Sequence, residues 1–387
     1  MFWPERPVIS RPFWREKLHR AWASAPVVWL TGVRRIGKTT IARELANATF
    51  LNCDLPSTRR RLEDPERFYP SMETPLVIFD EIHRLPDPSQ VLKIAADEFG
   101  RLRILATGSS TLAATTKFRD TLTGRKRTVH LLPVLHRELA AFGVSDLRRR
   151  LLHGGLPEPL LSRSKDPEFF AEWLDSFYAR DIQELFRVGK RQEFLRLLEL
   201  VLRTSGSLLE ATSLAKHCGL SRPTVLSYLD VLQLTHVLVL LRPFHGGGRQ
   251  EILRQPKVYG FDTGFVSFCR GWERLREQDC GLLWEHLVLE TLVAQGPRRI
   301  HYWRDKQKRE VDFVLPHRAG QCDAIECKWK AESFSSRSLR AFRASHPEGL
   351  NFVISPQSDP AYVREVDRMT IVFCNLEQWA SGETTNL

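Results

Sequence analysis

The chain of 387 residues is predicted to be an α/β protein with more than one compact unit. Two observations carry this prediction. In the first third of the chain, short apolar runs typical of buried strands alternate with charged stretches of helical character. Near the C-terminus strands and helices are expected to alternate again, with acidic residues at alternate strand positions. Because a single core stops growing at about 250 to 300 residues, we expect two to four units.

The first strand, expected at residues 25–30, is followed by the sequence Thr-Gly-Val-Arg-Arg-Ile-Gly-Lys-Thr-Thr. The two glycines let the backbone curl so that its N–H groups face a phosphate, and the helix that follows directs its positive end at the same anion. In such a loop Lys38 reaches the β- and γ-phosphates, and the Thr39 hydroxyl binds Mg²⁺. The alternative is a chance match of a glycine-rich turn, which the flanking strand and helix disfavour. The expected nucleotide contacts are Gly32, Arg34, Arg35, Ile36, Gly37, Lys38, Thr39 and Thr40.

A second apolar strand, residues 75–79, ends in Asp80 and Glu81. Buried strands rarely end in two acids without a cation nearby. We expect Asp80 to support Mg²⁺ and Glu81 to polarise the attacking water. The Asp-Glu pair is similar to that of AAA+ ATPases, and the chain contains no Asn-Lys-x-Asp guanine motif. ATP with Mg²⁺ is therefore the expected cofactor.

A third strand is expected at residues 103–107, leading into Gly-Ser-Ser at 108–110. Ser109 is placed either to sense the γ-phosphate or to cap the next helix, and the sequence leaves both roles open. The apolar residues 131–135 predict a fifth strand.

Arg125 follows a helix expected at residues 111–124. In AAA+ ATPases an arginine at this point is a finger that reaches the γ-phosphate of a neighbouring subunit. The alternative is an arginine that contacts DNA together with Lys126 and Arg127.

A charged helical stretch, residues 151–202, has the composition of a lid over the nucleotide. Within it, Arg180 is placed either to touch the nucleotide or to form an exposed ion pair with Asp181 or Glu184.

Residues 206–260 resemble a winged helix. A helix at residues 214–220 ends in a glycine turn, and Ser221 is expected to cap a second helix. The residues that share the buried face of this second helix are Val225, Leu229 and Leu232.

Such a module either binds DNA or serves only as a packing unit. A pair of strands is expected at residues 237–241 and 256–261, with a glycine-rich tip between them. The candidate DNA contacts lie on the second helix and at this tip: Arg222, Thr224, Ser227, Tyr228 and Arg249.

The C-terminal part of the chain holds a second group of chemical residues. Glu285 lies on an apolar helix, where an unpaired carboxylate is costly. A strand at residues 310–315 carries Asp312, and alternation on the next strand places Glu326 and Lys328 side by side. Two carboxylates with a lysine are the minimum set for Mg²⁺-assisted phosphodiester hydrolysis, with Asp312 and Glu326 holding the metal.

This order of strands and helices resembles the PD-(D/E)xK restriction-endonuclease-like fold. The alternative is a surviving fold whose carboxylates form salt bridges with the basic residues 304–309.

Nearly the whole chain resembles a bacterial and archaeal AAA+ family with a C-terminal domain of long-uncharacterised function. The stretches that carry the resemblance are 32–39, 76–81, 107–110, 124–125, 154–157, 178–182, 310–313 and 325–328. The resemblance implies ATP, Mg²⁺ and assembly into homo-oligomers, including hexameric rings. The expected units are an ATPase core (1–145), a helical lid (146–205), a winged helix (206–262) and a nuclease-like domain (263–387).

Net charge is +11, which attracts polyanions. Lys and Arg outnumber acids seven to one over residues 101–130 and six to one over 298–309. These clusters favour DNA as a partner over a protein-signalling role. The seven cysteines form no C-x-x-C pair, no apolar run is long enough for a membrane span, and no signal layout begins the chain. We expect a cytoplasmic ATPase that either has DNA endonuclease activity or is an ATP-switched DNA-binding protein.

Overall fold

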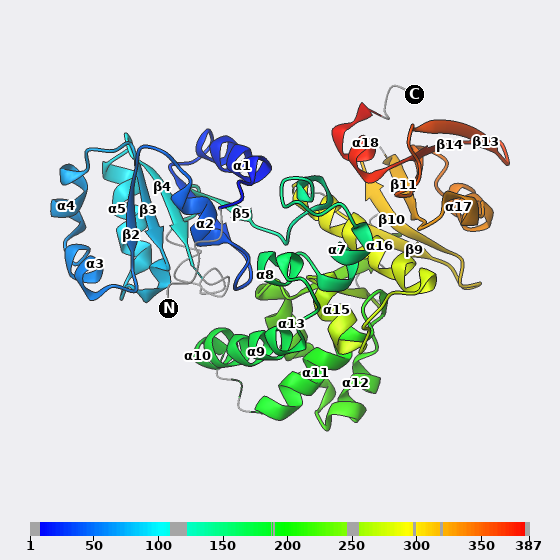
Figure 1. Ribbon diagram of the computed structural model, residues 1–387, viewed down its shortest axis with the longest axis horizontal. Coiled ribbons are helices and arrows are strands. Elements are labelled where there is room, and N and C mark those ends of the chain that lie inside the picture. The colour runs from blue at the N-terminus through cyan, green and yellow to red at the C-terminus, as the bar shows by residue number, and fades with distance from the viewer. Residues whose placement is uncertain are drawn as a thin grey trace.

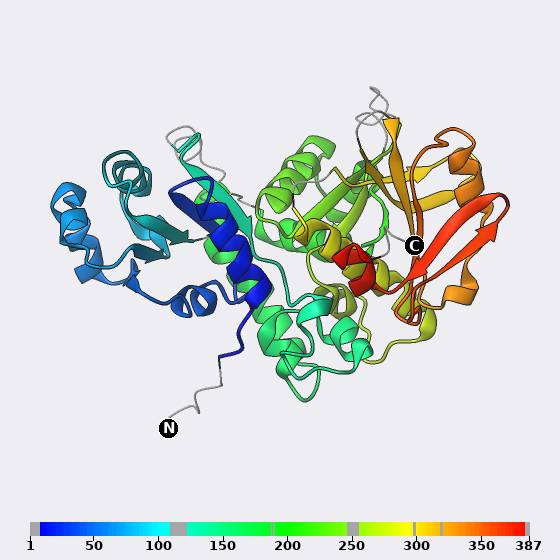
Figure 2. The same cartoon turned by 90° about the horizontal axis from the view of Figure 1, so that it is seen from above.

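The computed structural model describes residues 8–108, 122–186, 188, 190–245, 255–296, 299–317 and 320–383. Two lobes, each built on a β-sheet, lie on either side of a group of helices (Figures 1 and 2). Two predicted site residues, Ser109 and Arg249, lie outside the described residues. The helix expected at 111–124 also lies outside them, apart from residues 122–124.

The N-terminal lobe is a parallel sheet with the strand order β2-β3-β4-β1-β5. Its strands are β1 (Val27–Thr31), β2 (Ala48–Asn52), β3 (Leu76–Asp80), β4 (Arg103–Thr107) and β5 (Lys126–His130). Alternate residues of the central strands enter two cores. Helices α1 (Pro12–Trp22) and α2 (Lys38–Arg43) pack on one face. Helices α3 (Pro56–Arg61), α4 (Pro65–Phe68) and α5 (Pro88–Glu98) cover the other. The predicted parallel-sheet P-loop core is confirmed.

The fifth strand is residues 126–130, and the expectation of a strand at 131–135 is wrong. Residues 131–135 are apolar because they are buried in a linker between the lobes. Pro133 cannot donate to a ladder, and its carbonyl accepts a hydrogen bond from Arg11 at 3.3 Å. The strand itself was hidden because it lies at the sheet edge and carries polar side chains.

A group of helices follows the linker and lies between the two lobes (Figure 1). They are α7 (Leu147–His153), α8 (Pro157–Leu161), α9 (Pro167–Phe177), a π-helical turn η5 (Tyr178–Ile182), α10 (Gln183–Phe186) and α11 (Arg191–Arg203). The next segment holds β6 (Ser207–Leu208), α12 (Ala211–Cys218), α13 (Arg222–Leu234), β7 (Leu238–Pro243) and β8 (Lys257–Gly260).

The sequence located α13 correctly. The Ser221 hydroxyl accepts a hydrogen bond from the Thr224 backbone N–H at 3.2 Å, which caps the helix. Val225, Leu229 and Leu232 are buried, as their spacing predicts.

The second sheet has the order β13-β14-β12-β11-β10-β9-β7-β8-β6. Its remaining strands are β9 (His301–Arg304), β10 (Glu310–Pro316), β11 (Cys322–Cys327), β12 (Asn351–Ile354), β13 (Tyr362–Val366) and β14 (Met369–Cys374). The neighbouring helices are α15 (Thr263–Cys269), α16 (Glu277–Ala294), α17 (Arg337–Arg343) and α18 (Leu376–Ser381).

This sheet crosses the expected boundary at 262 and 263. Strand β7 pairs in parallel with β9, which joins β6, β7 and β8 to the C-terminal strands. Helices α16 and α17 contribute to two separate cores against the C-terminal strands. In the part of the chain that the structure covers, no helix combines the length and the apolar character that a bilayer crossing requires.

Candidate functional site

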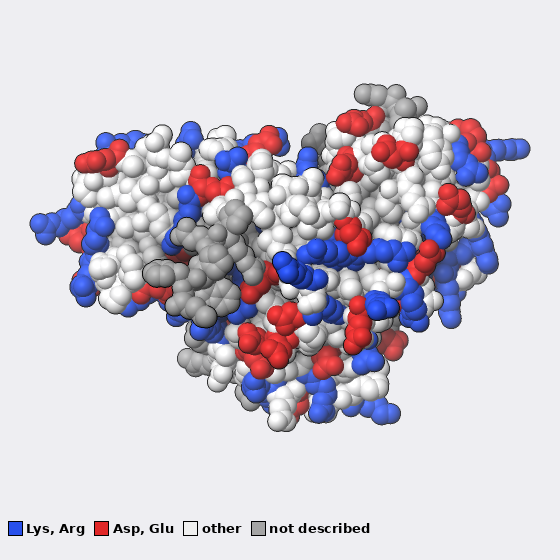
Figure 3. All heavy atoms as spheres, viewed as in Figure 1, with Lys and Arg blue, Asp and Glu red and all other residues white. Residues whose placement is uncertain are grey.

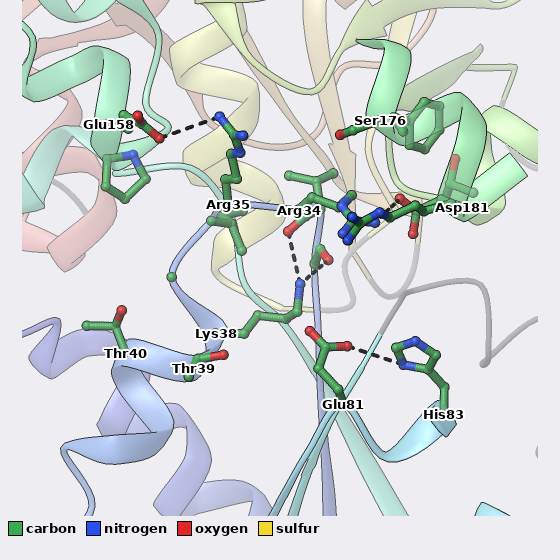
Figure 4. Close-up of a pocket in the computed structure, with 18 of the residues that line it drawn as sticks. Arg34, Arg35, Lys38, Thr39, Thr40, Glu81, His83, Glu158, Ser176 and Asp181 are labelled. Carbon is green, nitrogen blue, oxygen red and sulfur yellow. Dashed lines mark hydrogen bonds and ion pairs between the residues drawn. The ribbon is translucent and has the colours of Figure 1, made fainter. Parts of the chain in front are cut away.

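The phosphate-binding loop lies between the end of β1 and the start of α2. Gly32 has φ +150°, and a Cβ there would lie 2.7 Å from the Leu131 carbonyl oxygen, so the loop requires glycine at this position. The Lys38 ammonium donates to the carbonyls of Gly32 at 2.9 Å and Val33 at 3.0 Å (Figure 4). Burial lowers the pKa of Lys38, while Glu81 and Asp181 oppose this effect. The lysine is thus held inside the loop that the sequence predicted.

Asp80 ends β3 next to the loop. Its carboxylate accepts the Thr39 hydroxyl at 2.9 and 3.1 Å and the Thr107 hydroxyl at 2.5 Å. A hydroxyl and a carboxylate are the hard oxygen ligands that Mg²⁺ prefers, and Mg²⁺ commonly takes only one or two protein ligands beside phosphates. Thr39 and Asp80 therefore fit such an ion.

Thr107 is a site residue that the sequence prediction missed. It ends β4, is fully buried, and also accepts the Glu81 backbone N–H at 3.2 Å. The sequence did contain a signal for Thr107, because this polar residue ends β4 directly after the apolar residues 104–106.

Glu81 has the left-handed backbone (φ 55°) and projects into the same space as Lys38 (Figure 4). Its carboxylate lies 3.2 Å from Nδ1 of His83, which the sequence prediction also missed. Burial lowers the pKa of His83, so the imidazole is neutral near pH 7. Glu81 is partly exposed, as a residue that contacts a water nucleophile must be.

A cavity of about 940 Å³ opens between the loop and the helices that follow the linker. The Arg34 guanidinium lies 3.4 Å from the Asp181 carboxylate. The Arg34 backbone carbonyl accepts the Trp173 indole N–H at 3.1 Å. Arg35 lies 3.7 Å from Glu158 (Figure 4). Both loop arginines thus contact the lid segment as well as the cavity. The cavity also includes cationic residues that suit a polyphosphate, among them Lys38, Arg84 and Arg180.

Arg125 lies just before β5, at the edge of the sheet where the parallel strands begin. The phosphate loop follows the other end of β1, so Arg125 does not reach the nucleotide cavity of its own chain. Its guanidinium forms an ion pair with Asp97 at 2.5 Å and is partly exposed.

Acidic residues from β10, β11 and α16 gather in the C-terminal lobe. Lys328 lies 2.6 Å from Glu326 and 3.7 Å from Asp312, so the structure brings together the three residues that the strand pattern predicted. Asp312 Oδ2 accepts the Cys327 backbone N–H at 2.8 Å. Burial, and next the charge of Asp312, raise the pKa of Glu326 to about 7.

Glu285 pairs with Lys257 at 3.0 Å, and Lys257 also pairs with Glu310 at 2.7 Å. We did not predict Lys257 from the sequence as part of this site. The salt-bridge alternative paired the site carboxylates with the basic residues 304–309. Among these residues Arg304 pairs with Glu310 at 2.8 Å, whereas Glu285 pairs with Lys257.

The fit of this acidic site to Mg²⁺ rests on few ligands. Across the described residues, no group of three His, Cys, Asp or Glu side chains is arranged to hold a metal. Asp312 and Glu326 offer two carboxylates, and Glu326 Oε1 is buried without a hydrogen-bond partner among those residues. Two carboxylates suffice for Mg²⁺ when water and substrate phosphate complete the shell.

The candidate DNA contacts on α13 differ in exposure. Arg222 and Ser227 are exposed and Thr224 is partly buried. Tyr228 is 8% exposed and packs edge-to-face against Phe194 of α11, so its prediction as a DNA contact is wrong.

The fold and the nucleotide site define a P-loop ATPase of the AAA+ class, and a family model described as an AAA domain matches residues 24–140. Two models described as domains of unknown function, DUF8612 and DUF4143, match residues 144–276 and 280–374. The first of these covers the segments expected as lid and winged helix.

Two mycobacterial proteins, each 31% identical over 348 residues, cover 86% of this chain and 77% of their own length. They are uncharacterized protein Rv2008c of Mycobacterium tuberculosis and uncharacterized protein Mb2031c of Mycobacterium bovis. The chain belongs to the family of these proteins.

Two solved structures show weaker likeness. The Walker-type ATPase PABY2304 of Pyrococcus abyssi is 16% identical, with 68% of this chain and 96% of that chain covered and a TM-score of 0.44. AMPPCP-bound DnaA from Aquifex aeolicus is 10% identical, with 57% and 85% covered and a TM-score of 0.26.

Proposed function

We propose that this AAA+ ATPase is an ATP-dependent DNA-binding and DNA-processing protein whose C-terminal lobe is a nuclease-like domain. The course of α13 is the observation that supports it best. Arg222 in the first turn is exposed, and Thr235 at the opposite end lines the nucleotide cavity. A helix of 13 residues is ~20 Å long. One rigid element thus reaches from the nucleotide to the surface that we assign to DNA.

The surface charge supports DNA as the partner. Lys and Arg form a band across the middle of the face in Figure 3, where Figure 1 shows α7 and α16. With residues 206–262 acting as a winged helix, Arg222, Thr224 and Ser227 contact the duplex. Because phosphate contacts release counterions, DNA affinity is expected to fall steeply as salt rises.

At the nucleotide site, Mg²⁺ is held by Thr39 and Asp80, and Glu81 polarises the attacking water. Lys38→Ala is expected to abolish ATP binding. Glu81→Gln is expected to bind ATP normally and to lower kcat by at least about 100-fold, because only the transition state loses the base. Equilibrium binding of a fluorescent ATP analogue and steady-state hydrolysis measure both. A Glu81→Gln protein that cannot bind ATP contradicts this assignment.

At the acidic site, Asp312 and Glu326 hold a second Mg²⁺, and Lys328 orients the nucleophile or offsets charge. Glu285 supports this metal. The test is incubation of the full chain with Mg²⁺, ATP and single-stranded, duplex and branched DNA. Wild type is expected to cut at millimolar Mg²⁺ and to stop when the metal is chelated. Asp312→Ala is expected to abolish cutting while ATP hydrolysis and most DNA binding remain.

A second candidate is an ATP-switched DNA-binding protein in which the nuclease-like domain is inactive. Lys257 and Lys328 favour it, because both ammonium groups already neutralise carboxylates of the acidic site. This candidate predicts salt-dependent DNA binding that ATP modulates, with every DNA in the panel left uncut under Mg²⁺ or Mn²⁺.

A further inference from the structure

Two side chains of strand β8 enter the acidic site from outside the expected nuclease-like domain. Lys257 donates to Glu285 Oε1 at 3.0 Å and to Glu310 Oε1 at 2.7 Å. The Tyr259 hydroxyl donates to the same Glu285 oxygen. Lys257 is 3% exposed and Tyr259 is fully buried. A buried ammonium is costly unless it is paired, so these contacts fix Lys257 and its acids relative to one another.

The continuous sheet explains how β8 reaches this site. Strand β8 pairs with β7, β7 pairs with β9, and β9 pairs with β10, which carries Glu310 and Asp312. Because side chains alternate along a strand, Lys257 and Tyr259 project from the same face of β8. The ladder shifts register between Val311 and Val314, which places Asp312 at an irregularity of β10. Such irregularities occur often beside active sites because they redirect a side chain.

We propose that Lys257 and Tyr259 are positioning residues of the acidic site, which fix Glu285 as a third acid beside Asp312 and Glu326. The inference rests on the proposed metal-binding role of that site. The Lys257 ammonium and the Tyr259 hydroxyl both donate to Oε1 of Glu285, so neither of these two hydrogen bonds involves Oε2. Mg²⁺ and Mn²⁺ retain water ligands in such sites, and a fixed carboxylate oxygen accepts hydrogen bonds from them.

This assignment changes the extent of the site. It is not contained in residues 263–387, because β8 supplies two of its hydrogen-bond donors. Strand β8 belongs to the same segment as α13, whose C-terminal end lines the nucleotide cavity. A movement of this segment during the ATP cycle would therefore displace Lys257 and Tyr259 relative to Glu285.

The test measures Mn²⁺ binding to the full chain by electron paramagnetic resonance, in the absence of nucleotide. The Asp312→Ala variant gives the background of Mn²⁺ that binds elsewhere. Tyr259→Phe removes one hydroxyl and is expected to weaken Mn²⁺ binding about tenfold, the effect typical of a hydrogen bond to a charged group. Tyr302→Phe is the matched control. The Tyr302 ring also lies near the Lys257 ammonium, at 5.9 Å against 5.6 Å for Tyr259, but its hydroxyl donates to the Gln255 carbonyl. It is expected to change the affinity less than twofold.

Lys257→Met separates positioning from simple charge balance. Removal of a cation would tighten Mn²⁺ binding if Lys257 only offset charge. Loss of positioning would weaken it, which is the expected result, and Lys257→Arg is expected to restore most of the affinity.

Three results would overturn the inference: no Mn²⁺ bound above the Asp312→Ala background, equal effects of the two tyrosine substitutions, or tighter binding by Lys257→Met. Failure of the proposed nuclease gives a different pattern. Mn²⁺ binding that depends on Tyr259 in a protein that cuts no DNA supports the inference and removes the nuclease. Cutting that is unchanged by Tyr259→Phe keeps the nuclease and removes the positioning role.

Discussion

Asp80 and Glu81 are held by a residue outside the two recognised motifs. The Thr107 hydroxyl donates to Asp80 and accepts the Glu81 backbone N–H. Thr107→Val keeps the shape but leaves that N–H without its acceptor. We expect a loss of about 1 to 3 kcal/mol in unfolding free energy. We also expect kcat for ATP hydrolysis to fall about tenfold, with ATP affinity changed less, because the base and the metal ligand lose a common support.

Thr31→Val is the matched control for this prediction. Thr31 also ends a buried strand, and its hydroxyl has no hydrogen-bond partner among the described residues. The control is expected to hydrolyse ATP at the wild-type rate. Equal losses in both variants, measured by steady-state hydrolysis and by denaturant unfolding, would show that Thr107 has no special role.

At this scale the sequence predicted the residues whose type and spacing define a motif. Lys38 and Thr39 come after β1, Asp80 ends β3 and Glu81 follows it. The parallel strands bring these ends to one edge of the sheet. The position of Tyr228 was not predictable in the same way. Local periodicity placed it beside the buried face of α13, and its burial depends on packing between helices, including the contact with Phe194 of α11.

Long-range ion pairs join the elements and leave no local trace in the sequence. Arg150 of α7 is fully buried and donates to Glu290 of α16, the Val134 carbonyl and the Thr263 hydroxyl. Glu290→Ala removes the carboxylate that pairs directly with this guanidinium. We expect about 3 to 5 kcal/mol of destabilisation, because removing one partner of a buried ion pair is costly. Thermal or denaturant unfolding of the full chain measures it.

Glu277→Ala, on the same helix α16, is the control for Glu290→Ala. Glu277 pairs with Lys330 at 2.6 Å, but its side chain is 59% exposed. Exposed pairs contribute about 0 to 1 kcal/mol, so little change is expected. A small effect of Glu290→Ala, comparable to that of the control, would mean that Arg150 finds another partner or solvent.

The elements themselves were largely predictable, because apolar periodicity and caps determine them locally. The pairing of β7 with β9 could not be predicted in this way, because it joins Arg242 to His301, which lie far apart in the sequence. The expected boundary at 262 and 263 followed a change in sequence pattern, whereas the sheet follows hydrogen bonds between strands. The same join explains why Lys257 was missed as part of the acidic site.

At the scale of the whole molecule, the position of Arg125 bears on assembly. Its side chain lies at the opposite edge of the sheet from the phosphate loop of its own chain, so a direct contact with a nucleotide phosphate requires the nucleotide of a neighbouring subunit. If Arg125 is a finger that acts in trans, Arg125→Ala is expected to lower ATP turnover by about 10³-fold with ATP binding retained.

Mixing two inactive variants tests this prediction directly. Arg125→Ala keeps an intact nucleotide site, and Lys38→Ala keeps the arginine. A mixed assembly therefore contains interfaces in which the nucleotide site of the first variant faces Arg125 of the second. We expect partial recovery of hydrolysis that rises with protein concentration, since assembly obeys mass action. Asp97→Ala, which releases Arg125 from its ion pair, is expected to hydrolyse ATP without the partner variant. Normal turnover by Arg125→Ala alone, together with weaker and less salt-dependent DNA binding, would instead assign Arg125 to the DNA surface.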